Sequence, residues 1–139
     1  MRIRVLLADD SDMAREAMRK VIAGEPRIEI VGDVANFAQT VQAIAELEPA
    51  VLLLDLHLAE KRAFTPALVK SQLACVHHIL AVSFSSDAEA RDLAQSYGAK
   101  SLLDKMRLFN ELVPAILECR PTEKYLHSSD VSSERLQAN

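Results

Sequence analysis

Five polar residues in this chain lie within two positions of the ends of short apolar runs, and together they could act on a phosphoryl group: Asp9, Asp10, Asp55, Ser83 and Lys105. Three neighbouring carboxylates would repel one another and raise at least one pKa unless a cation neutralised them. Mg²⁺ is such a cation, because it prefers oxygen ligands and is typically held by carboxylates together with phosphate oxygens. The set therefore predicts a magnesium-dependent phosphoryl site.

Each of these residues has a role in the predicted chemistry. Asp55 would be the nucleophile, with an aspartyl phosphate as the product. The metal would shield the two negative reactants, Lys105 would meet one phosphoryl oxygen, and the Ser83 hydroxyl would donate to another. Taken singly, the residues also have structural explanations, such as helix capping by the acidic pair or a solvated lysine. Their combination, in this order along the chain, is hard to obtain from independent structural needs.

A parallel sheet would bring these residues together. The apolar runs are rich in Val, Ile and Leu and alternate with helical segments, which indicates a parallel sheet covered on both faces. Ligands of such open sheets bind outside the carboxyl ends of the strands. We expect strands at 3–8, 28–31, 50–54, 78–82 and 101–103, a first helix after residue 12, and helices at 37–47, 66–73, 87–97 and 109–119.

Several helix ends can also be predicted. We expect Asp12 and Asn110 to be the N-caps of the first and last helices, with Met13, Ala17 and Val21 on the apolar face of the first. Gly98 is expected to end the fourth helix, because glycine readily adopts the left-handed conformation that follows many helices.

Length and charge exclude several classes of protein. The 139 residues are enough for one domain, and the formal net charge of −4 provides no basic face for nucleic acid or a membrane surface. The apolar runs are far shorter than the ~20 residues that span a bilayer. The three glycines permit neither a P-loop nor a dinucleotide-binding fingerprint. We therefore expect a cytoplasmic protein that itself binds neither nucleic acid nor membrane.

Two segments carry a resemblance to a known family: Val5-Leu6-Leu7-Ala8-Asp9-Asp10 and Leu52-Leu53-Leu54-Asp55-Leu56. Together with Ser83 and Asp104-Lys105, they resemble the receiver domain of two-component response regulators, over about residues 2–119. The segment 28–32 and Gly98-Ala99 are most similar to receivers that precede a LuxR-type DNA-binding domain.

This resemblance implies a fold and a division of the chain. The fold would be a flavodoxin-like, doubly wound α/β structure, with a five-stranded parallel sheet of order 2-1-3-4-5 and five helices. It would occupy residues 1–120, followed by a polar C-terminal tail or truncated linker at 121–139.

The resemblance also implies roles for individual residues. Asp55 would be the phosphoacceptor, and Ser83 and Lys105 would be the phosphoryl-sensing pair. The phosphodonor would be a sensor histidine kinase or a phosphotransfer protein. The implied Mg²⁺ ligands are Asp9, Asp10, Asp55 and the backbone carbonyl of His57.

The chain also departs from the family pattern. The loop from Leu58 to Arg62, which includes Ala59, lacks the usual Pro and Gly. Phe84 replaces a small residue and would cover the phosphoryl pocket, which should alter phosphorylation and dephosphorylation rates. Leu102 stands where the family has an aromatic that moves on activation, and Met106 stands where Pro is common. A cis bond before Met106 would be costlier than one before proline.

Three functional hypotheses differ in how they use this site. The first is a phosphorylation-controlled receiver that switches association with a downstream protein, with a homodimer as one form of association. The second is a phosphorylation-independent interaction platform. On either hypothesis the chain could be the N-terminal part of a LuxR-type transcriptional regulator. The third, a haloacid-dehalogenase-like phosphatase, needs a second Asp where this chain has His57. We therefore expect no enzyme beyond self-catalysed aspartyl phosphorylation and dephosphorylation.

Overall fold

The computed structural model describes residues 2–59 and 64–119. Within them, five parallel strands form one sheet of order β2-β1-β3-β4-β5. The strands are β1 (Ile3–Ala8), β2 (Ile28–Val34), β3 (Val51–Asp55), β4 (His78–Ser83) and β5 (Ser101–Asp104). The helices are α1 (Asp12–Ile22), α2 (Phe37–Leu47), α3 (Pro66–Gln72), α4 (Ala88–Ser96) and α5 (Leu108–Leu117), with a short 3₁₀ helix, η2 (Lys105–Arg107).

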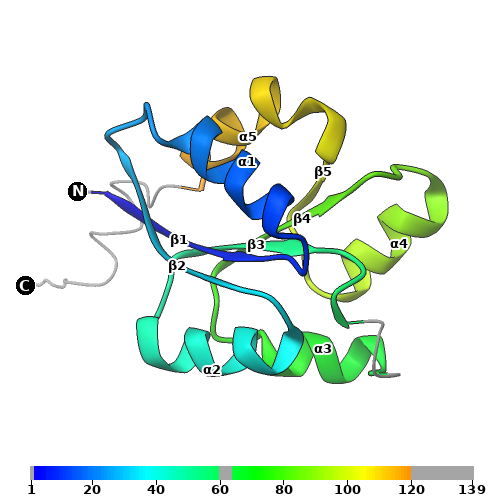
Figure 1. The fold of residues 1–139 in the computed structure, drawn as a ribbon. Helices are drawn as coiled ribbons and strands as arrows, with labels where there is room; N and C mark the ends of the chain where they lie inside the picture. Colours follow the sequence, from blue (N-terminus) through cyan, green and yellow to red (C-terminus); the bar gives the residue numbers. More distant parts are fainter. Residues whose placement is uncertain (1, 60–63, 120–139) are drawn as a thin grey trace, which may run out of the picture.

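Helices cover both faces of the sheet, with α1 and α5 on one side and α2 and α3 on the other (Figure 1). Strand residues alternate between the two cores, because successive side chains point to opposite faces. Val5 and Leu7 pack in the core beneath α1 and α5, whereas Leu6 and Ala8 pack in the core that includes α2, α3 and α4. Every residue of β3 is buried, as expected for the central strand of a parallel sheet.

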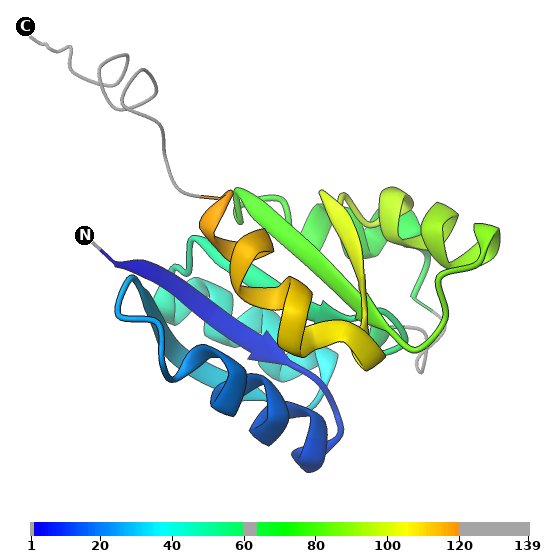
Figure 2. The same cartoon turned by 90° about the horizontal axis from the view of Figure 1, so that it is seen from above.

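The strands run side by side, so their carboxyl ends meet at one edge of the sheet (Figure 2). In the pairing register, Asp55 lies opposite Val82 on β4, and Ser83 lies opposite Asp104 on β5. The strands that carry predicted site residues therefore all end at the same edge of the sheet.

The structure confirms the predicted fold class, strand order and number of helices. The bounds of β1 and α2 agree with the prediction, and Gly98 follows α4 with a φ of 90°. The strand predicted at 28–31 continues to Val34, because these additional residues still pair with β1. No helix in the described ranges is long and apolar enough to cross a membrane.

Two predicted N-caps are wrong. Ser11 rather than Asp12 caps α1, because its side chain accepts a hydrogen bond from the Ala14 amide. The last helix begins at Leu108, directly after η2, so Asn110 lies inside it. Of the residues predicted on the apolar face of α1, Met13 and Ala17 are exposed, whereas Val21 is partly buried and packs against the core. Met18 and Ile22 form the buried face of α1 instead.

Candidate acidic phosphoryl site

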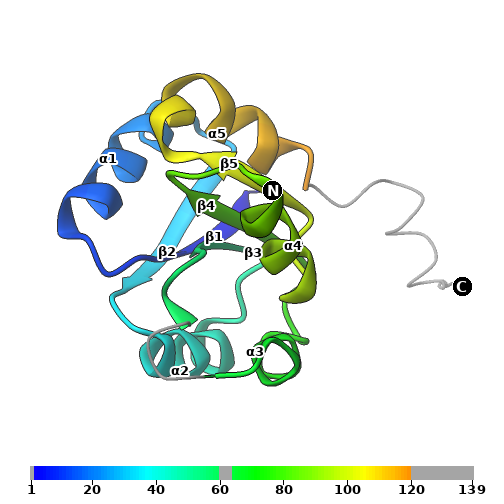
Figure 3. The same ribbon diagram turned by 90° about the vertical axis from the view of Figure 1, so that its right-hand side faces the viewer.

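Four strands bring predicted site residues to one rim, which faces the viewer in Figure 3. Asp9 directly follows β1, Asp55 ends β3, Ser83 ends β4, and Lys105 directly follows β5. The parallel order of the sheet places β1, β3, β4 and β5 next to one another. Residues that are distant in the sequence therefore become neighbours.

Asp9, Asp10 and Asp55 form an acidic cluster. Each offers one carboxylate oxygen, and these oxygens all lie within 4.8 Å of one another. Asp9 and Asp55 are buried, whereas Asp10 is exposed, so the cluster opens to solvent on one side. The Ser11 amide donates to Asp9 Oδ1 at 2.9 Å and ties the start of α1 to the cluster.

The Lys105 ammonium sits against the two buried acids. Its Nζ lies 2.7 Å from Asp9 Oδ2 and 3.5 Å from Asp55 Oδ1, and the side chain is only 7% exposed. An ammonium so close to two carboxylates partly neutralises them. The site thus contains its own positive charge beside the acids.

The carboxylate of Asp55 is destabilised by its surroundings. Burial raises the pKa of Asp55, and the negative charge of Asp9 raises it further, whereas Lys105 acts in the opposite direction. The backbone amide of His57 donates to Asp55 Oδ1 at 3.4 Å and also favours the charged form. The Asp55 carboxylate therefore lies close to the charges of Asp9 and Lys105 and has little contact with water.

The residues of the cluster fit a hard divalent cation. Oδ2 of Asp9 is completely buried and faces the Lys105 ammonium at 2.7 Å, so it is a charged oxygen with no access to bulk water. Mg²⁺ is suited to such oxygens. Asp9, Asp10 and Asp55 could hold the ion, and the exposed side of Asp10 leaves room for water ligands.

Ser83 and Phe84 lie on the β4 side of the rim. Ser83 is buried, and its Oγ accepts a hydrogen bond from the Ser85 amide at 3.1 Å, which orders the turn after β4. Phe84 is 70% exposed, and its ring centroid lies 5.2 Å from Lys105 Nζ. The structure thus places Phe84 over the lysine of the site.

The other predicted residues lie around this centre. Ala59 is completely buried, and Leu102 packs partly buried against the core beneath α4. The side chain of His57 is exposed. No peptide bond in the described ranges is cis, so Lys105 and Met106 are joined by a trans bond. Residues 60–62 of the loop without Pro and Gly, and the predicted C-terminal tail at 121–139, lie outside the described residues.

Sequence reasoning did not identify Arg15. Its guanidinium donates to the Asp9 backbone carbonyl and also pairs with Asp12, so it joins the acidic loop to the first turn of α1. The i,i+3 spacing of Asp12 and Arg15 could have indicated this pair.

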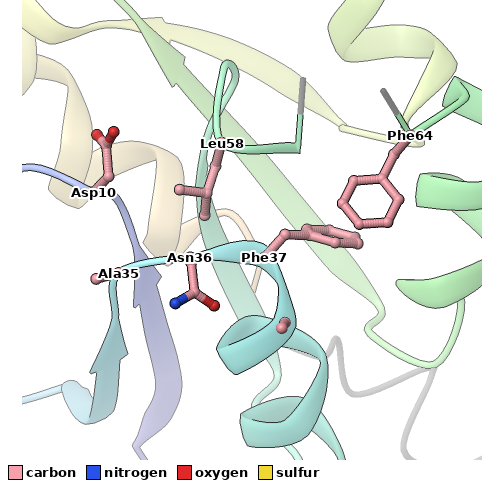
Figure 4. A pocket seen from close by; sticks show the side chains of 7 residues that line it. Asp10, Ala35, Asn36, Phe37, Leu58 and Phe64 are labelled. Atoms are coloured by element: carbon pink, nitrogen blue, oxygen red, sulfur yellow. The ribbon is translucent and has the colours of Figure 1, made fainter. Parts of the chain in front are cut away.

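A pocket next to Asp10 was also missed. Asp10 lies at one end, and the rings of Phe37 and Phe64, with centroids 5.1 Å apart, lie at the other (Figure 4). Asn36 and Leu58 also line it. These residues come from the segments after β1, β2 and β3, including the first turn of α2, so no single segment of the sequence could have revealed the pocket.

Comparisons with curated proteins detect partial similarity. The chain is 43% identical over 56 residues to the transcriptional regulatory protein BtsR of Salmonella typhi, covering 40% of this chain and 23% of that protein. It is 30% identical over 103 residues to a protein-glutamate methylesterase/protein-glutamine glutaminase of Anaeromyxobacter dehalogenans, covering 74% of this chain and 30% of that enzyme. The chain thus matches less than a third of the length of these relatives. No protein-family model matches it.

Comparisons with solved structures establish the fold. The signal receiver domain of NarL from Mycobacterium tuberculosis superposes with a TM-score of 0.74 at 24% identity, covering 85% of this chain and 95% of that domain. A LuxR-family two-component response regulator from Aurantimonas sp. SI85-9A1 superposes with a TM-score of 0.72 at 22% identity, covering 99% of this chain and 100% of that structure. The chain has the fold of response-regulator receiver domains.

Proposed function

We propose that this chain, which has the receiver fold, is a signalling domain that accepts a phosphoryl group on Asp55. The observation that carries the proposal is the buried Asp55 carboxylate, held with Asp9 and Asp10 in one cluster and 3.5 Å from the Lys105 ammonium. Asp55 would serve as the nucleophile and Lys105 as a positive charge for the transferred group. Mg²⁺, when bound by the three acids, would offset negative charge on the two reactants.

The transfer can be written with balanced bonds. An oxygen of the Asp55 carboxylate attacks phosphorus, the new O–P bond forms, and the bond from phosphorus to the donor breaks. With a phosphohistidine donor, the electron pair of the P–N bond returns to the imidazole nitrogen, which takes up a proton. Lys105 and the Ser83 hydroxyl would contact the phosphoryl oxygens of the product.

The proposal includes partners and a place in the cell. The donor would be a sensor histidine kinase or a phosphotransfer protein, and the output would be altered association with a downstream protein, in the cytoplasm. BtsR is named a transcriptional regulatory protein, and the Aurantimonas protein is named a LuxR-family response regulator. We therefore favour an output that is linked to transcription. DNA contact would then belong to a further domain rather than to residues 2–119.

A second candidate function is an interaction platform that does not depend on phosphate. It is favoured by Lys105, which already partly neutralises the buried acids, and by Phe84, whose ring lies beside that ammonium. On this hypothesis no phosphoryl group would change the charge of the site, and a partner would bind the same surface at all times.

Intact-mass measurement after incubation with acetyl phosphate separates the two functions. We expect one phosphoryl adduct on the wild type with Mg²⁺, none with EDTA, and none on Asp55→Asn. Asp33→Asn is a matched control, because it removes an acid of β2 outside the cluster. An adduct that survives in Asp55→Asn would refute the assignment of Asp55. No adduct on the wild type or on Phe84→Ala, with acetyl phosphate or a phosphorylated histidine kinase, would favour the platform.

A further inference from the structure

The Lys105 ammonium has neighbours of two chemical kinds. Asp9 Oδ2 and Asp55 Oδ1 lie 2.7 and 3.5 Å from Nζ, and the Phe84 ring centroid lies 5.2 Å away. A cation within about 6 Å of a ring centroid is attracted by the negative face of the ring. Phe84 therefore adds an attraction to the ammonium besides that of the acids.

The exposure of the two side chains supports a specific role for the ring. Phe84 is 70% exposed, so the hydrophobic core does not account for its position. The Lys105 side chain is only 7% exposed although it ends in a charge. These values are consistent with a ring on the solvent side of the ammonium, where it limits contact with water and strengthens the ion pairs beneath.

We infer that Phe84 is a positioning residue that holds the Lys105 ammonium on Asp9 and Asp55, so that a divalent metal must compete with this internal cation. Two cations at the same carboxylates repel each other. The shortest contact of the Lys105 ammonium is with Asp9, which is one of the three acids that would hold the metal. Phe84 thereby lowers metal affinity and raises the Mg²⁺ concentration at which the site fills. The inference rests on the proposed function for the identity of the metal site.

Calorimetric titration of the full chain with Mg²⁺ tests this competition. Phe84→Leu keeps an apolar side chain but removes the ring face, and we expect it to bind Mg²⁺ about two- to fivefold more tightly than the wild type, the range given by an exposed cation–π contact. Phe84→Tyr keeps the ring and should bind like the wild type. Phe109→Leu is the matched control, because Phe109 is 84% exposed in α5 and should leave the affinity unchanged.

Proton NMR of the metal-free protein provides a second readout, independent of phosphorylation. Protons above a ring face shift upfield, so the ε-methylene signals of Lys105 should be displaced in the wild type and in Phe84→Tyr. The displacement should disappear in Phe84→Leu and remain in Phe109→Leu. This signature reports the position of Lys105 directly, which a general effect on folding would not do.

The outcomes distinguish this inference from the proposed function. Equal or weaker Mg²⁺ binding by Phe84→Leu, or undisplaced Lys105 signals in the wild type, would overturn the role of Phe84 whether or not Asp55 is phosphorylated. Conversely, a tighter Phe84→Leu site in a protein that gives no phosphoryl adduct would support the competition and overturn only the phosphoacceptor function. A wild type and variants that all bind no Mg²⁺ would overturn both.

Discussion

Lys105 Nζ lies 2.7 Å from Oδ2 of Asp9, a carboxylate that is completely buried. Removing one partner of a buried ion pair leaves the other charge without compensation. We predict that Lys105→Met lowers the free energy of unfolding by about 3 to 5 kcal/mol in metal-free buffer, measured by urea denaturation. Mg²⁺ should restore part of this loss, because a ligand that binds only the folded state stabilises it.

Lys20→Met is the control for this experiment, because Lys20 is an exposed lysine near the end of α1. It should change stability by less than about 0.5 kcal/mol, as most surface substitutions do. Equal effects of the two lysine substitutions would show that the buried pair adds no stability.

The Asp55 carboxylate should destabilise the metal-free protein at neutral pH. Burial and the charge of Asp9 raise its pKa in the folded state, so stability falls as pH rises from the unfolded pKa through the folded one. Asp55→Asn removes this charge at nearly constant size and should raise the urea midpoint in EDTA. Asp33→Asn loses an ion pair with Arg19 and should not raise it. A lower midpoint for Asp55→Asn would contradict the prediction.

Ser11 supports both a helix and the acidic loop. Its Oγ accepts from the Ala14 amide at 3.1 Å, and its own amide donates to Asp9 Oδ1 at 2.9 Å. Ser11→Ala removes only the cap and should cost about 1 kcal/mol of unfolding free energy. Ser11→Asp, which keeps a capping oxygen, should recover most of it. A Ser11→Ala variant as stable as the wild type would exclude the hydroxyl as a stabilising group.

His78 should make the protein less stable in mild acid. Burial, followed by the charges of Lys100 and His77, lowers the pKa of His78 in the folded state. As pH falls below about 6.5, the unfolded chain therefore takes up the proton more readily, and stability is lost until the folded pKa is passed. His78→Gln should reduce the loss of stability between about pH 7 and about pH 5. Identical pH profiles for His78→Gln and the wild type would count against this assignment.

Much of the architecture could be predicted because it depends on patterns that the chain repeats. The alternation of apolar runs with helical segments indicated a parallel sheet, and polar residues after the runs indicated the rim. The structure has the predicted site residues at or directly after the carboxyl ends of strands, as the sequence indicated: Asp9, Asp55, Ser83 and Lys105. A prediction of this kind needs only the positions of strands in the sequence.

Contacts that depend on side-chain direction could not be predicted. Phe84 was expected to cover a pocket, but its ring position beside Lys105 depends on the turn after β4. The N-cap of α1 was misplaced because Ser11 and Asp12 are both good capping residues, and only the backbone decides between them. The predicted apolar face of α1 was only partly right, because Val21 packs against the core whereas Met13 and Ala17 are exposed.

The order of the strands has a consequence for how the site comes into being. Asp9 follows the first strand and Lys105 follows the last, so their contact closes a loop that contains most of the described chain. Contacts of such high contact order form only after a large loss of chain entropy. A proteolytic fragment that lacks Asp9 or Lys105 would lack part of the site. On the proposed function, Mg²⁺ affinity would therefore report whether the chain has folded as far as the contact between Asp9 and Lys105.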